Sequence, residues 1–272
     1  MKGWWIVPMI ILSLVSVANS DPPVIRGWIL EGQSNMDQGR GPLHSYWINI
    51  PRNVIYLVDD DWSACDDECC YCYDNPMLGT QLVKYTSFKQ QERHGPEIAL
   101  AYSIAKQYPN DLNIIIKLAR SGTSMNNWQP DAPLYNLLLS HINEMEAKHP
   151  GIIWMAVFED QGDSDAKTLD DANAFFDRKS SMIIRLREDL GLPDLPWFME
   201  LINQDALMFP YCDVVDIAQL TIPAHIHNVR VVPALWMVKY YEGTIRIHYT
   251  TYAQHMQGRL MWETYMSWLS GR

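Results

Sequence analysis

The sequence predicts an α/β fold of three layers, in which a mostly parallel sheet of about five strands lies between two layers of helices. Two observations carry this prediction. Apolar, β-branched segments such as Ile114-Ile115-Ile116 alternate along the chain with segments whose apolar residues recur at helical spacing. No Gly/Ser linker or internal repeat divides the sequence, so residues 21–272 are expected to form a single domain.

The expected elements follow one another in strict alternation. Residues 24–30 form an apolar run typical of a strand that is buried on both faces. The helix that opens at Gly95-Pro96-Glu97 carries proline in its first turn, where the missing N–H costs nothing. Further strands are expected at 53–58, 112–118, 152–158 and 197–202, with a weaker one at 229–232. Further helices are expected at about 133–148 and 169–190, near 214, and at about 250–269.

Residues 1–20 have the layout of a secretory signal peptide. Lys2 precedes a nearly uninterrupted apolar stretch, and Ala18-Asn19-Ser20 supplies small residues around a cleavage point. The stretch is shorter than the roughly 18 to 20 residues that cross a bilayer, and Pro8 interrupts it, so a permanent anchor is the weaker alternative. We therefore expect a secreted, extracellular protein without a stable membrane anchor.

The charge balance excludes one class of partner. The chain has 21 Lys and Arg residues against 32 Asp and Glu residues, a net charge of −11, and no basic block. Nucleic-acid binding requires basic side chains that neutralise phosphates, so no nucleic-acid partner is expected. Nothing in the sequence indicates the oligomeric state.

The cysteines are unevenly distributed. Four lie in an acidic loop at about 60–76, and the fifth, Cys212, is far downstream. In a secreted protein disulfides are the first interpretation, and an odd count leaves one thiol unpaired or bonded to another chain. Zinc is the alternative, although the C-x3-C-C-x-C spacing is not that of a familiar zinc site. The four clustered residues are Cys65, Cys69, Cys70 and Cys72.

Polar turns follow three of the expected strands, at 32–35, 121–124 and 161–165. Ligands of parallel α/β sheets bind at the carboxyl ends of the strands, so these turns are expected to build one site. Ser34 follows a buried strand directly, and Gly32 permits a tight turn before it. A serine placed in this way is a candidate nucleophile, provided that a base and oxyanion donors lie nearby. The alternative is a serine that only caps the next segment.

Five blocks carry a resemblance to a known family, and they lie in the family's order over nearly the whole chain. They resemble the blocks of SGNH hydrolases, in the carbohydrate acetylesterase and sialate O-acetylesterase branch, which implies an SGNH, flavodoxin-like fold. The blocks are Gly32-Gln33-Ser34-Asn35-Met36, His94 to Ala101, Ser121-Gly122-Thr123-Ser124 with Trp128, Gln161-Gly162-Asp163-Ser164-Asp165-Ala166, and Ile247 to Gln254.

The resemblance implies a serine esterase that removes O-acetyl groups from carbohydrates, either acetylated polysaccharide or O-acetyl sialic acid, without metal or cofactor. Ser34 would attack the acetyl carbonyl to give an acyl-enzyme, with His248 as general base and then general acid. The backbone N–H groups of Ser34 and Gly122 and the side chain of Gln161 would bind the oxyanion, and Asn35 would contribute to substrate binding. Glu97 and Trp128 are expected to be structural.

One departure from the family bears on activity. The family has an aspartate three residues before its histidine to orient the imidazole, whereas this chain has Ile245. Asp163, where the family usually has glutamate, is the first candidate to replace that carboxylate, and Glu242 is the second. The alternative function is a weak or inactive relative that binds glycans as a secreted module, an interpretation favoured by Ile245 and by the 11 tryptophans and 14 tyrosines.

Overall fold

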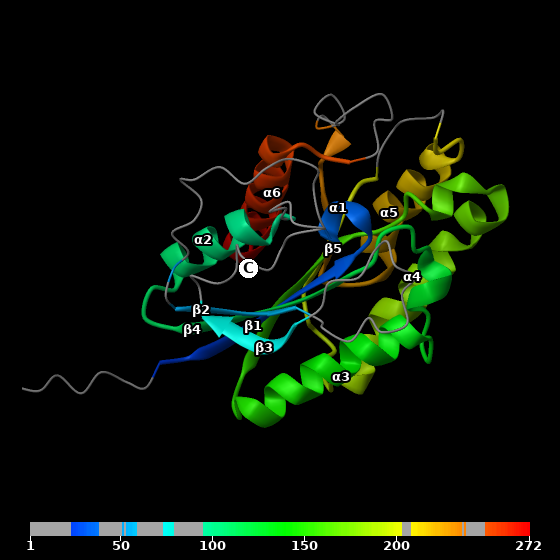
Figure 1. The fold of residues 1–272 in the computed structure, drawn as a ribbon. Helices are drawn as coiled ribbons and strands as arrows, with labels where there is room; N and C mark the ends of the chain where they lie inside the picture. Colours follow the sequence, from blue (N-terminus) through cyan, green and yellow to red (C-terminus); the bar gives the residue numbers. More distant parts are fainter. Residues whose placement is uncertain are drawn as a thin grey trace, which may run out of the picture.

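A seven-stranded sheet forms the middle layer of the protein (Figure 1). The computed structural model describes residues 23–37, 51, 53–58, 73–78, 95–202, 208–235, 237 and 248–272. The strand order is β3-β2-β4-β1-β5-β6-β7; β3 is antiparallel to β2, and all the other neighbours pair in parallel. The strands are β1 (Ile25–Gly32), β2 (Val54–Val58), β3 (Tyr73–Leu78), β4 (Leu112–Ala119), β5 (Ile153–Asp160), β6 (Trp197–Glu200) and β7 (Val229–Val232).

The helices cover both faces of this sheet, which confirms the three-layer α/β prediction. Helices α2 and α6 lie on one face, and α3, α4 and α5 lie on the other (Figure 1). The predicted boundaries agree with the structure to within a few residues. The helices are α1 (Ser34–Asp37), α2 (Glu97–Gln107), α3 (Pro133–Lys148), α4 (Leu169–Asp189), α5 (Cys212–His225) and α6 (Thr251–Ser270), with short 3₁₀ helices η3 (Met125–Trp128) and η4 (Asp165–Lys167).

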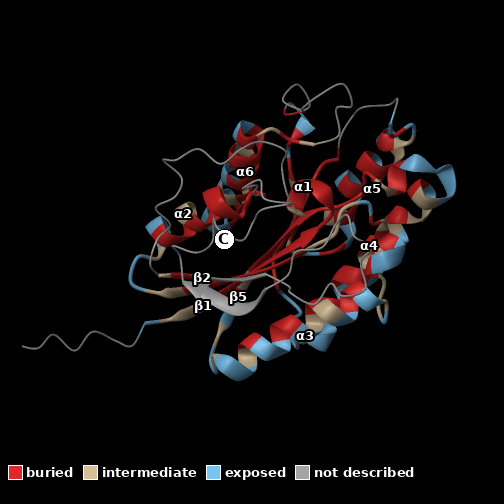
Figure 2. Cartoon of the chain, in the orientation of Figure 1, coloured by how far each residue is buried: buried red, intermediate tan, exposed pale blue. Residues whose placement is uncertain are grey.

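Two hydrophobic clusters explain why the central strands are apolar at consecutive positions. In β1, Ile29 packs in the cluster under α3, α4 and α5, whereas its neighbours Trp28 and Leu30 pack in the cluster under α2 and α6. In β4, Ile114 and Ile115 divide between the two clusters in the same way. Successive side chains of a strand point to opposite faces, so a sheet covered on both sides needs apolar residues throughout. Figure 2 shows the central strands and the inward sides of the helices as buried.

The sheet differs from the prediction at one edge. β3 (Tyr73–Leu78) overlaps the end of the expected cysteine-rich loop and adds an antiparallel strand beside β2. Proline has no backbone N–H to donate to a neighbouring strand, so Pro76 argues against a strand at this place in the sequence. An edge strand has a neighbour on one side only, and a proline whose nitrogen faces the open side is tolerated there. The four clustered cysteines and the expected signal peptide lie outside the described residues, so their disulfides, zinc alternative and cleavage stay predictions.

Cys212, the fifth cysteine, is a buried free thiol at the first residue of α5. Burial raises the pKa of this thiol, with the charge of Asp213 as a second cause. Among the helices in the described ranges, none combines the length and the apolar character that crossing a membrane requires.

Candidate active site

Ser34 lies in a turn that two adjacent strands hold in place. β1 ends at Gly32, and α1 begins at Ser34. Between them, the backbone N–H of Gln33 donates to the carbonyl oxygen of Asp160, the last residue of β5, at 2.9 Å. The Ser34 side chain is largely enclosed, and the residue is 7% exposed. The strand-end turn expected from the sequence is therefore present, and it is hydrogen-bonded to β5, the neighbouring strand in the sheet.

Gly32 is needed in this turn because the backbone of β5 approaches it closely. A β-carbon on Gly32 would lie 2.2 Å from the carbonyl oxygen of Asp160, and Gly32 has a φ of +152°. Real β-carbons do not come so close to a carbonyl oxygen, so a side chain here would push the two strand ends apart. The glycine thus sets the position from which Ser34 is presented.

We expect Gly32→Ala to destabilise the protein more than Gly151→Ala. Gly151 also has a positive φ, +89°, but a β-carbon there meets no atom within 4 Å. Backbone strain alone costs about 1–3 kcal/mol, and only Gly32→Ala adds a clash with the backbone. Urea denaturation of the two variants measures the difference. A Gly32→Ala variant as stable as Gly151→Ala would show that the strand ends yield without cost.

The second polar turn lies beside the first. The backbone N–H of Arg120 donates to the carbonyl oxygen of Gly32 at 2.9 Å, which joins the end of β4 to the end of β1. Gly122, two residues after Arg120, has a φ of +79°, and a β-carbon there would meet no atom within 4 Å. Thr123 Oγ1 donates to the Arg120 carbonyl at 2.7 Å and accepts from Trp128 Nε1 at 3.2 Å. Trp128 is fully buried, which confirms its structural role.

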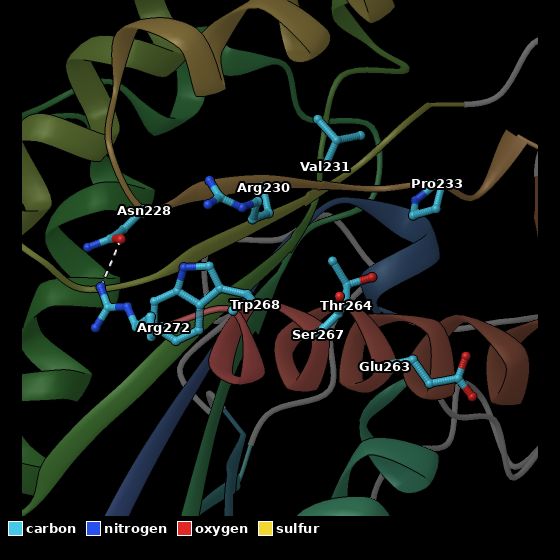
Figure 3. A pocket seen from close by; sticks show the side chains of 10 residues that line it. Asn228, Arg230, Val231, Pro233, Glu263, Thr264, Ser267, Trp268 and Arg272 are labelled. Carbon is cyan, nitrogen blue, oxygen red and sulfur yellow. Dashed lines mark hydrogen bonds between the residues drawn. The ribbon is translucent and has the colours of Figure 1, made fainter.

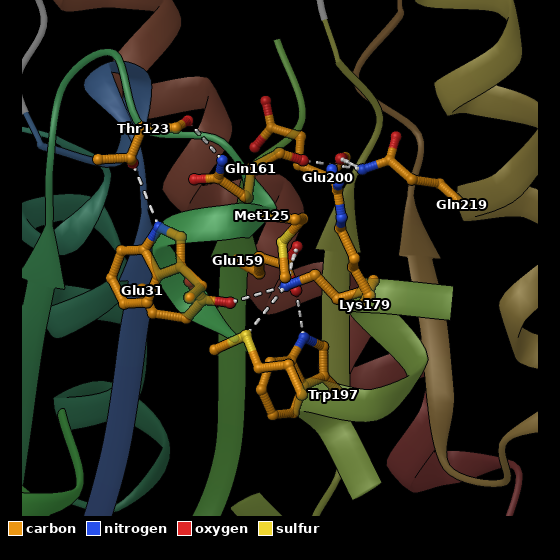
Figure 4. Close-up of polar contacts among 12 residues, drawn as sticks. Glu31, Thr123, Met125, Glu159, Gln161, Lys179, Trp197, Glu200 and Gln219 are labelled. Carbon is orange, nitrogen blue, oxygen red and sulfur yellow. Dashed lines mark hydrogen bonds and ion pairs between the residues drawn. The ribbon is translucent and has the colours of Figure 1, made fainter. Parts of the chain in front are cut away.

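Side chains of the third turn bind the backbone of the second turn and of η3, which follows it. Gln161 Nε2 donates to the carbonyl oxygen of Thr123 at 2.7 Å (Figure 4). Asp165 Oδ1 accepts from the backbone N–H of Met125 at 2.9 Å, and burial raises the pKa of Asp165 to about 6. One N–H of the Gln161 amide is thus occupied within the protein. Its role as an oxyanion donor stays a prediction.

Asn35 connects the serine turn to the segment that carries His248. Asn35 Oδ1 accepts from the backbone N–H of Tyr249 at 3.1 Å, and the Asn35 carbonyl oxygen accepts from Gln254 Nε2 at 3.1 Å. Asn35 is 2% exposed, so both bonds are shielded from water. The residue after Ser34 therefore binds the residue after His248. The side-chain oxygen of Asn35 is engaged in this link, and a role in substrate binding stays a prediction.

Several buried carboxyl groups lie at the carboxyl ends of β5 and β6 and on α5. They are Asp160, Asp163, Glu200 and Asp216. Gln257 Nε2 donates to Asp160 Oδ2 at 2.7 Å, and Asp160 interacts electrostatically with Glu200 and Asp163. Burial is the main cause that raises the pKa of Glu200 to about 8, the pKa of Asp216 to about 7 and that of Asp160 well above its usual range. Glu200 is therefore mostly protonated at neutral pH and Asp216 is about half protonated, which limits the negative charge beside the site.

Asp163, the first candidate to orient His248, belongs to this group of carboxyls and is 3% exposed. His248 itself is partly buried and lies three residues before the first residue of α6. A contact between the two side chains stays a prediction. Glu242 and Ile245, the second candidate and the position of the missing aspartate, lie outside the described residues.

Lys117, a residue of β4, binds the helix α1 that contains Ser34. Its role was not predicted from the sequence. Lys117 Nζ donates to the carbonyl oxygen of Asp37 at 2.6 Å and to Glu97 Oε2 at 3.0 Å. Glu97 Oε1 in turn accepts from the backbone N–H of Gly95 at 3.1 Å. Glu97 is therefore structural, as expected, but through an ion pair as well as through its helix end. The signal was a lysine inside the β-branched run of β4.

A second buried lysine connects the two strands that lead into the serine and glutamine turns (Figure 4). Lys179 Nζ on α4 lies 3.1 Å from Glu31 Oε1 and 2.7 Å from Glu159 Oε1. Trp197 Nε1 donates to Glu159 Oε2. All four side chains are inaccessible to solvent. Burial raises the pKa of Glu31 to about 8. Burial alone would lower the pKa of Lys179, but the attraction of Glu159 and Glu31 is larger, and the net effect is a raised pKa.

Among the pockets lined by described residues, two lie away from these turns, beside α6. One, of about 580 Å³, lies between β7 and the C-terminal half of α6 (Figure 3), and the other, of about 360 Å³, lies between α2 and α6. Neither is lined by Ser34 or by any other predicted site residue. Within the described part of the chain, no three His, Cys, Asp or Glu side chains are grouped as they would be around a metal ion.

Comparison with known proteins finds a relative among the carbohydrate esterases. A curated relative, a probable carbohydrate esterase of Arabidopsis thaliana, is 30% identical over 175 residues, which is 64% of each chain. The match thus spans less than two thirds of that relative's length.

Solved structures show the same fold. The crystal structure of an Arabidopsis thaliana protein has a TM-score of 0.72 at 23% identity, covering 90% of this chain and 99% of that one. The crystal structure of NanS has a TM-score of 0.70 at 17% identity, covering 92% and 99%. A carbohydrate acetylesterase from Xanthomonas citri has a TM-score of 0.59 at 12% identity, covering 86% and 54%.

One family profile matches a region that includes both the three polar turns and the segment with His248. The profile described as "SASA: Carbohydrate esterase, sialic acid-specific acetylesterase" matches residues 25–267, from the start of β1 to the last turns of α6. This chain therefore belongs to the sialic acid-specific acetylesterase family of carbohydrate esterases.

Proposed function

We propose that the protein is a serine esterase that removes O-acetyl groups from carbohydrates, with Ser34 as the nucleophile and His248 as the base. The observation that carries the proposal is the link through Asn35, whose side chain accepts from the backbone of Tyr249 at 3.1 Å. It joins the residues that follow Ser34 and His248 at the carboxyl end of the sheet, where ligands of such folds bind. Family membership supports the same chemistry.

In the proposed reaction Ser34 Oγ attacks the acetyl carbonyl carbon while the His248 imidazole takes the serine proton. The carbonyl oxygen becomes an oxyanion, facing the backbone N–H groups of Ser34 and Gly122. His248 then gives the proton to the leaving sugar oxygen as the ester bond breaks, and Ser34 is left acetylated. Water attacks the acetyl group with the same base assistance and releases acetate.

The oxyanion donors are expected to differ in their contributions. Gly122 is exposed, and a β-carbon there would meet no atom within 4 Å, which supports access of a substrate oxygen to its backbone. Gln161 already donates to Thr123, so its first contribution is to hold the second turn in place. Each properly aimed donor is worth about 3–4 kcal/mol in the transition state. We propose Asp163 as the carboxylate that orients His248, with Glu242 as the alternative.

We propose an acetylated polysaccharide or O-acetyl sialic acid as the substrate, encountered outside the cell after removal of residues 1–20. The name of the Xanthomonas citri structure, a carbohydrate acetylesterase, and the description of the family support a small acyl group on a sugar hydroxyl. The family description names sialic acid, which supports O-acetyl sialic acid among these candidates.

Acetate release from a panel of acetyl xylan, acetylated pectin and O-acetyl sialic acid tests the proposed function. We expect the purified wild type to release acetate from at least one of them, and His248→Ala to release almost none, because the serine then has no base. Binding of the same glycans is measured in parallel. Binding by the wild type without acetate release from any glycan would contradict the esterase and favour a secreted glycan-binding module.

A further inference from the structure

Tyr249, which follows His248, is held at both ends by buried groups that the proposed reaction does not use. Its backbone N–H donates to Asn35 Oδ1 at 3.1 Å, and its hydroxyl donates to Glu200 Oε1 at 2.8 Å. Tyr249 and Asn35 are each 2% exposed, and Glu200 is 1% exposed. Neither bond competes with water, so both restrain the residue strongly.

The two acceptors are themselves fixed to the sheet. Glu200 is the last residue of β6, and its carbonyl oxygen accepts from Gln219 Nε2 of α5 at 2.8 Å (Figure 4). The same amide nitrogen lies 3.2 Å from the carbonyl oxygen of Gln161, as its second acceptor. Asn35 is fixed by the bond that its carbonyl oxygen accepts from Gln254 of α6. Tyr249 is therefore anchored to β6, α1 and α6.

This anchoring restrains His248 through the covalent chain. The nitrogen of Tyr249 and the carbonyl group of His248 belong to one planar peptide unit, so a bond that fixes the Tyr249 N–H also fixes the plane that follows the His248 α-carbon. The acceptor of that bond, Asn35, is the residue next to Ser34. The distance from the serine to the histidine backbone thus depends on Tyr249.

We propose that Tyr249, bonded to Asn35 and Glu200, is a positioning residue that sets where His248 stands relative to Ser34. The inference rests on the proposed function and adds to it a device built from residues outside the expected triad. It has particular weight in this chain because Ile245 stands where an aspartate would otherwise orient the imidazole.

The role of Glu200 is geometric rather than electrostatic. Burial raises the pKa of Glu200 to about 8, and the hydrogen bonds from Gln257 and Tyr249 offset only part of that rise. Near neutral pH the carboxyl is therefore mostly protonated and serves as a neutral acceptor for the tyrosine hydroxyl. A glutamine at this position keeps an acceptor of the same shape, whereas a leucine removes it.

Tyr249→Phe is the decisive variant, because it removes only the hydroxyl and keeps the ring and the backbone N–H. We expect kcat for p-nitrophenyl acetate to fall by about 10- to 100-fold with KM nearly unchanged, since a small displacement of the base slows the chemical step without affecting binding. Tyr135→Phe is the matched control. Tyr135 is 1% exposed, and its hydroxyl donates to Asp189 Oδ2 at 2.6 Å, a bond that joins α3 to α4. It should lose comparable stability and keep kcat.

A pair of Glu200 variants separates positioning from simple loss of structure. Glu200→Leu should slow both kcat and the rate at which a fluorophosphonate modifies Ser34, and Glu200→Gln should restore most of both rates. One outcome would overturn the positioning role and leave the proposed function standing. In that outcome Ser34→Ala is inactive, whereas Tyr249→Phe and a folded Glu200→Leu variant are both fully active. Wild-type hydrolysis that Ser34→Ala leaves unchanged would overturn both.

Discussion

Ser34→Ala is expected to lower kcat for p-nitrophenyl acetate by about 10³- to 10⁶-fold, the range seen when a nucleophile that acts together with its base is removed. This corresponds to about 4–8 kcal/mol of transition-state stabilisation. The reason is that Ser34 supplies the attacking oxygen, and the Gln33–Asp160 bond and Asn35 hold it in a turn that has no second hydroxyl to replace it at the same position. Steady-state kinetics of the purified variant measure the loss.

Ser103→Ala is the control for this experiment. Ser103 lies on α2, and its hydroxyl donates to the carbonyl oxygen of Ala99 at 2.9 Å, one turn earlier in the same helix. The chemical change is identical, but the site is untouched, so kcat should stay within twofold of the wild type, an effect on the order of RT. A Ser34→Ala variant with the kcat of Ser103→Ala would exclude Ser34 as the nucleophile.

Lys179→Met is expected to have the largest effect on stability, about 3–5 kcal/mol, because it leaves Glu31 and Glu159 buried without their cation. Methionine replaces the length of the lysine stem but none of its charge. A loss of this size is a large part of the 5–15 kcal/mol that stabilises typical domains. Because the two glutamates precede Gly32 and Asp160, catalysis should fall as well. Urea denaturation followed by tryptophan fluorescence measures the stability.

Two further variants test whether the loss of stability comes from the buried charges. Lys148→Met removes an exposed lysine that pairs with Glu144 along α3, and a surface pair of this kind is worth about 0.5 kcal/mol or less. Lys179→Met combined with Glu31→Gln and Glu159→Gln should recover much of the stability, since no unpaired charge remains buried. Equal losses in Lys179→Met and Lys148→Met would show that the buried cluster contributes no more than a surface pair.

The sequence predicts best the features that depend on local patterns. The apolar runs of β1 and β4 and the helical spacing of α3 and α4 locate these elements to within a few residues, because burial on both faces of a sheet imposes a continuous signal. The turns at Gly32, Gly122 and Gln161 were placed correctly for the same reason: each follows such a strand. β3 was missed because an edge strand that contains Pro76 obeys neither pattern.

The contacts that organise the site were beyond prediction because they join distant parts of the chain. Asn35 was expected to bind substrate, yet its side-chain oxygen binds the backbone of Tyr249, more than 200 positions away in the sequence. Lys179 lies on one helix among many charged residues, and only the packing of α4 against the sheet shows that it is the buried one. Lys117 is the exception, since a lysine in an apolar strand indicates a buried ion pair.

Covalent labelling tests the central claim most directly. A fluorophosphonate forms a stable bond only with an activated serine, so peptide mass spectrometry of the labelled wild type should place the modification on Ser34 alone. The same reagent should fail to modify Ser34→Ala and should modify His248→Ala at a much lower rate, because the base is then missing. Stoichiometric labelling at another serine, or a labelling rate at Ser34 that His248→Ala leaves unchanged, would contradict the account.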